Sequence, residues 1–241
     1  MISRYQKNET FFPRAPRVEI YGVELSDLGW DGFFEEAFEK VSKEEWVPAR
    51  LTTETKINFS ALMEGGEEID CVVGGKVWHE ATCDADLPAV GDWVALELGG
   101  GEDDEHLIRA RLPRKTCFSR KAPGKSSQEQ VMAANVDVVV VVTDAGADFN
   151  VRRMERYFAL VSRSGAKCVV LVNKSDLFDE ETNAQAREEI QALWSDAEVH
   201  VTSATRKEGL EVIQSYLTPG TTLTMVGSSG VGKSTLVNQL L

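Results

Sequence analysis

The residues best suited to chemistry lie near the C-terminus, where glycines, a lysine and a serine occur at a recognisable spacing. Residues 227–234 read GSSGVGKS and fit the pattern GxxxxGK[ST]. Glycines let such a loop wrap closely around phosphate oxygens, and its N–H groups then form an anion site. Lys233 can neutralise phosphate charge, and Ser234 can offer its hydroxyl to Mg²⁺. We therefore predict a phosphate site, with Ser234 as the Mg²⁺ ligand, formed by Gly227, Ser228, Ser229, Gly230, Val231, Gly232, Lys233, Ser234 and Thr235.

A second run has the residue types needed to recognise a purine base. Asn173, Lys174, Ser175 and Asp176 directly follow the apolar run CVVLV, and ligands of open α/β sheets collect at the carboxyl ends of strands. The Asp176 carboxylate can accept hydrogen bonds from N1–H and the 2-amino group of guanine, neither of which adenine offers. Lys174 can lay its stem along the ring, and Asn173 can brace the loop and contact the base edge. The alternative interpretation is a helix cap after a strand.

A third element is the turn Ser203-Ala204, which follows a further apolar strand. In guanine-nucleotide proteins such a turn presents a backbone N–H to guanine O6, although the same residues also suit a plain turn. Together the three elements predict GTP or GDP as the ligand. A P-loop ATPase or kinase is disfavoured, because Asp176 would face an acceptor atom of adenine.

The elements that must position these loops alternate between strands and helices. Apolar runs typical of strands buried on both faces are separated by amphipathic segments, and the pattern predicts a parallel sheet with helices on both faces. The strands are expected within 136–145, 166–176, 197–204 and 222–227, and the helices within 150–165, 182–194, 208–217 and 232–241. No apolar run is long enough to cross a membrane, and the N-terminus lacks a secretory signal. We therefore expect a cytoplasmic protein without a membrane partner.

The residues before this sheet have a different pattern. Short β-branched stretches separated by Gly, Asp and Pro over residues 48–115 predict a small antiparallel, OB-like β-barrel. Residues 1–47 are expected to form an extension with a short helix in GWDGFFEEAFEKV, and residues 116–135 a polar linker. The predicted fold is thus a barrel (48–115) followed by an α/β P-loop GTPase domain (136–241).

The formal net charge of -13 is unusual for a nucleic-acid-binding protein. However, the segment from Arg109 to Lys125 holds seven basic residues and no acidic one. A solvated linker and a basic binding surface both fit this segment. The four cysteines include no CxxC pair, and Cys71, His79 and Cys83 match no established zinc spacing. Reduced cysteines that act as small hydrophobic residues are the expectation.

In Ras-like GTPases the phosphate loop precedes the NKxD motif. In this sequence the phosphate loop follows the NKxD motif, as in circularly permuted GTPases. With the preceding barrel, the chain resembles the RsgA/YjeQ family of small-ribosomal-subunit biogenesis GTPases, on the motifs LPAVGDWV, LPRKTCFSRKA, EQVMAANVD, DFNVRRMERY, VVLVNKSD, SAT and GSSGVGKST. The resemblance implies GTP hydrolysis stimulated by the small (30S) subunit during its late assembly. It also implies that an OB-fold contacts 16S rRNA, that residues 109–125 face RNA, and that the protein acts as a monomer.

The chain departs from the family pattern after the phosphate loop. The family continues with switch I, a DxxG motif and a zinc-binding domain, and this sequence ends at Leu241 with no DxxG. We therefore expect an incomplete GTPase domain, a fragment of a longer protein whose strand TLTMV is an exposed, aggregation-prone edge. No catalytic residue is assigned. The alternative function is an RNA- or ribosome-binding module that holds nucleotide without turnover.

Overall fold

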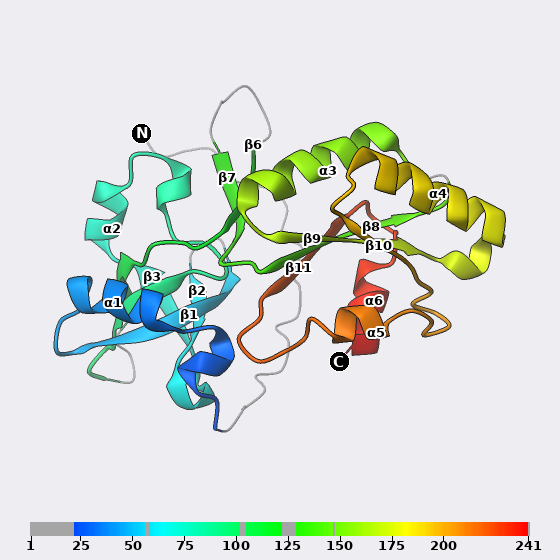
Figure 1. Ribbon diagram of the computed structural model, residues 1–241. Helices are drawn as coiled ribbons and strands as arrows, with labels where there is room; N and C mark the ends of the chain where they lie inside the picture. The colour runs from blue at the N-terminus through cyan, green and yellow to red at the C-terminus, as the bar shows by residue number, and fades with distance from the viewer. Residues whose placement is uncertain (1–21, 56–57, 102–104, 122–128, 147, 241) are drawn as a thin grey trace, which may run out of the picture.

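The computed structural model describes residues 22–55, 58–101, 105–121, 129–146 and 148–240. Residues 1–21 of the predicted extension, Lys125 and Leu241 therefore lie outside the described residues. A β-barrel and an α/β sheet lie side by side in the molecule (Figure 1). Among the described residues, none of the helices combines the length and apolar character that a membrane span requires.

Five short strands close into the barrel in the order β1-β2-β3-β5-β4. Their bounds are β1 (Trp46–Glu54), β2 (Phe59–Leu62), β3 (Glu68–Val73), β4 (Trp93–Glu97) and β5 (His106–Arg111). Alternate side chains point inward and form a core that includes Leu51, Leu96 and Ile108. The predicted barrel is confirmed, but it is not wholly antiparallel, because β3 and β5 pair in parallel. Helix α2 (Gly75–Glu80) and a 3-10 turn, η3 (Asp84–Asp86), connect β3 to β4.

The helix predicted in the extension is present as α1 (Gly32–Val41), after the 3-10 helix η1 (Leu25–Leu28). The carboxylate of Asp31 caps it by accepting from the backbone N–H of Phe33. Phe34 is buried against Trp93 of β4 and Leu112. This aromatic cluster fixes α1 on the outside of the barrel.

Residues 116–135 are not simply a polar linker. They hold an antiparallel ribbon of β6 (Cys117–Lys121) and β7 (Glu129–Ala134). The ribbon forms because Phe118 is buried in the core beneath α3, which anchors one strand and lets the next pair with it. Polar composition obscured this pattern.

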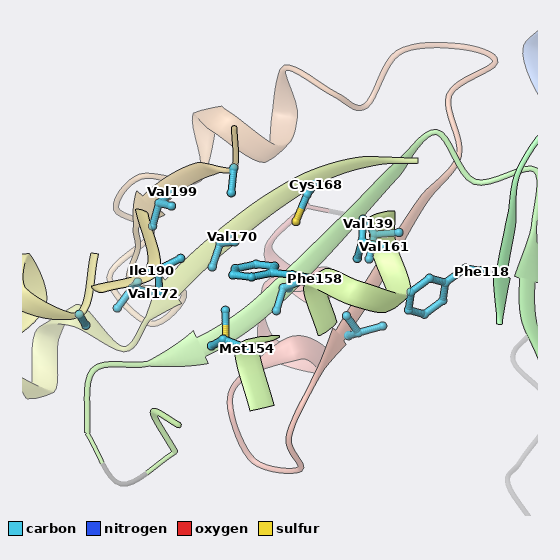
Figure 2. Packing of buried hydrophobic residues seen from close by; sticks show 14 of the residues in the cluster. Phe118, Val139, Met154, Phe158, Val161, Cys168, Val170, Val172, Ile190 and Val199 are labelled. Carbon is cyan, nitrogen blue, oxygen red and sulfur yellow. The ribbon is translucent and has the colours of Figure 1, made fainter. Parts of the chain in front are cut away.

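The second sheet is parallel, with the strand order β10-β9-β8-β11. Its strands are β8 (Val138–Asp144), β9 (Lys167–Asn173), β10 (Glu198–Val201) and β11 (Leu223–Gly227). Helices α3 (Val151–Ser164) and α4 (Glu180–Leu193) cover one face, where Phe158 and Ile190 pack on strand valines (Figure 2). Helices α5 (Glu211–Gln214) and α6 (Lys233–Leu240) lie on the other face. The predicted sheet with helices on both faces is confirmed.

Strand β11 lies at an edge of this sheet, as predicted. Leu223 and Met225 are only partly buried there, and they line an open groove that Val237 of α6 and Leu51 of the barrel also border. The edge of the phosphate-loop strand is therefore apolar and accessible among the described residues.

One arginine joins the barrel to this sheet. The guanidinium of Arg50 on β1 donates to the carbonyl of Leu28, to the carbonyl of Asn135 at 3.2 Å, and to Thr222 Oγ1 at 2.6 Å. Burial lowers the pKa of Arg50 from its ordinary value. Since Thr222 directly precedes β11, this contact fixes the strand that carries the phosphate loop relative to the barrel.

Candidate functional site

The phosphate loop connects β11 to α6, and three of its glycines have positive φ: Gly227 (152°), Gly230 (79°) and Gly232 (106°). A Cβ atom at Gly227 would lie 2.3 Å from the carbonyl oxygen of Val142 on β8. A Cβ at Gly232 would lie 2.3 Å from the Asn173 side-chain nitrogen. Glycine is required at both positions for steric as well as conformational reasons.

Lys233 lies over this loop. Its ammonium donates to the carbonyl oxygens of Gly227, at 2.8 Å, and Ser228, at 2.7 Å. Ser234 and Thr235 are exposed in the first turn of α6. The lysine charge and the helix N-terminus therefore meet at the loop, an arrangement that favours a bound anion.

Asn173, at the end of β9, ties the three predicted elements together. Its side-chain nitrogen donates to the carbonyl of Val231 in the phosphate loop at 3.0 Å. Its side-chain oxygen accepts from the backbone N–H of Ala204 at 3.1 Å and from Thr202 Oγ1 at 3.4 Å. The side chain is 1% exposed. One buried amide thus joins the phosphate loop, the NKxD run and the Ser-Ala turn.

The Ser-Ala turn also orients the predicted base-reading carboxylate. Ser203 Oγ donates to Asp176 Oδ1 at 2.6 Å and accepts from the backbone N–H of Arg206 at 3.1 Å. The hydrogen bond from Ser203 holds the pKa of Asp176 below its usual value. Asp176 is therefore a fixed, ionised acceptor, with its second carboxylate oxygen available for another donor. The Ala204 N–H, predicted to face guanine O6, donates to Asn173 in this structure.

Lys174 connects this run to a residue that the sequence interpretation missed. It adopts a left-handed backbone conformation (φ 62°), and its ammonium lies 3.3 Å from Asp144 at the end of β8. The other Asp144 oxygen accepts from the backbone N–H groups of Gly146 at 3.0 Å and Asp148 at 3.1 Å. The position of Asp144 at the carboxyl end of a buried strand was the signal that could have identified it.

Most of the described basic side chains in residues 109–121 make internal contacts, and the expected RNA-facing role of residues 109–125 stays a prediction. Arg114 forms a bidentate pair with buried Asp92, at 2.8 and 2.6 Å. Arg111 is partly buried and donates to the carbonyls of Asp86 and Leu112. Arg109 pairs with Glu97 at 2.6 Å, and Lys115 with Asp31. Arg120 and Lys121 are exposed.

All four cysteines are free thiols, and Cys71 and Cys168 are buried. Burial raises the pKa of the Cys71 thiol to about 12 and that of Cys168 to about 12. Cys83 is exposed, unlike the small buried residue expected from the sequence. Within the described part of the chain, no group of three or more His, Cys, Asp and Glu side chains is arranged to hold a metal ion.

Comparisons with known proteins agree with this geometry. The family model described as RsgA GTPase matches residues 111–241. A small ribosomal subunit biogenesis GTPase RsgA from Opitutus terrae is 44% identical over 90% of this chain and 60% of its own length. The protein of that name from Methanosarcina acetivorans is 40% identical over 92% of this chain and 58% of its own. The chain thus spans about three fifths of the length of these relatives.

A solved structure is also similar. The crystal structure of YjeQ from Thermotoga maritima has a TM-score of 0.63 and 26% sequence identity, and the match covers 81% of this chain and 65% of that chain. The similarity supports a barrel followed by a P-loop GTPase fold.

Proposed function

The chain belongs to the RsgA GTPase family, and we propose that it binds GTP and GDP and forms part of a GTP hydrolase acting in small-subunit assembly. The single observation that carries this proposal is the bridge made by Asn173. This side chain contacts both the phosphate loop and the Ser-Ala turn, which supports the proposal that the phosphate-binding and base-binding loops serve one ligand.

In this proposal the phosphates lie against the N–H groups of residues 227–233, and Lys233 exchanges its two loop carbonyls for phosphate oxygens. Asp176, held by Ser203, accepts from guanine N1–H and the 2-amino group. Guanine O6 would compete with the Asn173 carbonyl oxygen for the Ala204 N–H. The exposed hydroxyl of Ser234 fits a Mg²⁺ ligand, and that ion would neutralise phosphate charge.

The domain division follows the same proposal. Residues 48–115 are the proposed OB-like unit and residues 136–241 the proposed circularly permuted nucleotide-binding unit. Residues 1–47 are the extension, and residues 116–135, which include the ribbon, connect the two units. We propose that the OB-like unit contacts 16S rRNA, supported by its closed barrel. Of the basic segment, Arg120 and Lys121 are exposed for such contacts. The 30S subunit as partner, a monomeric state and a cytoplasmic location belong to the same proposal. The zinc that the family resemblance implies finds no ligand group among the described residues.

The test is multiple-turnover GTP hydrolysis by the purified chain, with and without small ribosomal subunits. The hydrolase proposal predicts turnover that rises with subunits and is lost in Lys233→Ala. GDP binding without turnover under both conditions would favour the nucleotide-holding module. Equal binding of ADP and GDP would contradict both.

A further inference from the structure

Arg153 extends from helix α3 to the phosphate loop. The α3 N-cap fixes its backbone, because Asn150 Oδ1 accepts from the N–H of Arg153 at 3.0 Å. From this anchored position its Nη1 hydrogen-bonds Ser228 Oγ, the second residue of the loop. A residue of the α3 start and a residue of the loop, 75 positions apart, are thereby joined.

The guanidinium is itself held in place. Arg153 Nη1 lies 2.5 Å from Asp148 Oδ1 and 3.4 Å from the carbonyl oxygen of Asp148. The backbone N–H of Asp148 donates to Asp144, which pairs with Lys174. A polar chain therefore runs from the phosphate loop through Arg153 to the base-reading run, separate from the direct bridge by Asn173.

We propose that Arg153 is a positioning residue that acts through Ser228 to hold the phosphate loop in its anion-binding conformation. This inference rests on the proposed nucleotide binding. The loop contains three glycines with positive φ, so the unconstrained backbone has many alternatives to lose when a ligand binds. A side-chain tie that removes some of them before binding increases affinity.

The exchange expected of Lys233 makes this tie more important. In the structure Lys233 donates to the carbonyls of Gly227 and Ser228. When its ammonium turns to phosphate, both carbonyls lose this donor. The Arg153–Ser228 contact uses a different atom of Ser228 and persists, so it holds the start of the loop after the lysine leaves.

Long-range attraction between the Arg153 charge and the nucleotide phosphates is a weaker explanation for an effect of Arg153 on binding. Asp148 lies against the guanidinium and offsets its charge, and the two side chains are 32% and 21% exposed. The effect should therefore depend on the contact with Ser228 and not on net charge alone. Arg152, the exposed neighbour on the same helix, provides a matched control for charge.

The experiment measures GDP affinity by fluorescence titration for the wild type, Arg153→Gln, Ser228→Ala and the double variant. We expect about tenfold weaker GDP binding in each single variant and no further loss in the double, since both remove the same charged hydrogen bond. Arg152→Gln should bind as the wild type does, and Arg153→Lys should recover part of the loss. Guanosine, which has no phosphate, should bind all variants equally, whereas general damage to the site would weaken it too.

Unchanged GDP affinity in both single variants, or losses that multiply in the double variant, would overturn the inference. Failure of the wild type to bind GDP is a different outcome, which would refute the proposed function itself.

Discussion

At the carboxyl edge of the parallel sheet the buried side chain of Asn173 connects loops, whereas beside the barrel the buried Arg114–Asp92 pair connects segments that adjoin β4 and β5. Asn173 joins three loops through one buried amide. In the barrel region, Arg114 and Asp92 form a pair whose side chains are 9% and 0% exposed. Arg114 also donates to the carbonyls of Ala85 and Leu87, and Asp92 accepts from the backbone N–H of Ala89. Comparable burial therefore supports the proposed ligand site in one region and stability in the other.

The comparison predicts that disruption of the barrel pair reduces stability without changing nucleotide affinity. Arg114→Ala leaves the Asp92 carboxylate buried without its cation, and we expect a loss of about 3–5 kcal/mol in the free energy of unfolding. Urea unfolding followed by tryptophan fluorescence reports it, because Trp93 lies in the adjoining aromatic cluster. Arg109→Ala is the matched control, since its pair with Glu97 is about one-third exposed and should change the free energy of unfolding much less. Weaker GDP binding by folded Arg114→Ala would break the comparison.

Disruption of the bridge made by Asn173 should reduce both the stability of the protein and its affinity for nucleotide. Asn173→Ala leaves the Ala204 N–H and the Val231 carbonyl without their partner, at a cost of about 2–4 kcal/mol in unfolding free energy. GDP affinity should fall at least about tenfold, because the two binding loops are no longer held together. Asp179→Ala removes only the side-chain cap of α4, so it should lower the free energy of unfolding by less than Asn173→Ala does and leave GDP binding intact. Titration and unfolding of the same samples would separate the two effects.

A smaller effect is expected at Ser203. Its hydrogen bond lowers the pKa of Asp176, so the carboxylate stays ionised as pH falls below the ordinary pKa. Affinity that depends on this carboxylate is present at higher pH and lost as pH falls through the lowered value. Ser203→Ala should move the loss toward higher pH and weaken GDP binding a few-fold at neutral pH. GDP titrations from about pH 2 to about pH 7 span the ordinary and the lowered pKa of the carboxylate and measure the shift, and identical acid limbs would contradict it.

Features that depend on neighbouring residues could be predicted from the sequence, whereas contacts between distant residues could not. The loops after β9, β10 and β11 were predictable, because glycine spacing and strand ends are local signals. The contacts of Arg114 and Arg153 were not, since each depends on a partner more than 20 residues away. The β6–β7 ribbon was missed because burial of Phe118 under α3 overrides its polar composition. A basic run alone does not distinguish internal pairs from a binding surface.

The central claim is that Asp176 recognises the guanine of a nucleotide whose phosphates lie on the Lys233 loop. Competition between GDP, ADP and xanthosine diphosphate in the wild type and Asp176→Asn tests it most directly. Asparagine offers a donor where aspartate accepts, which suits the C2 oxygen of xanthine and not the 2-amino group of guanine. The wild type should prefer GDP, and the variant should prefer xanthosine diphosphate. An unchanged order of preference would contradict the assignment.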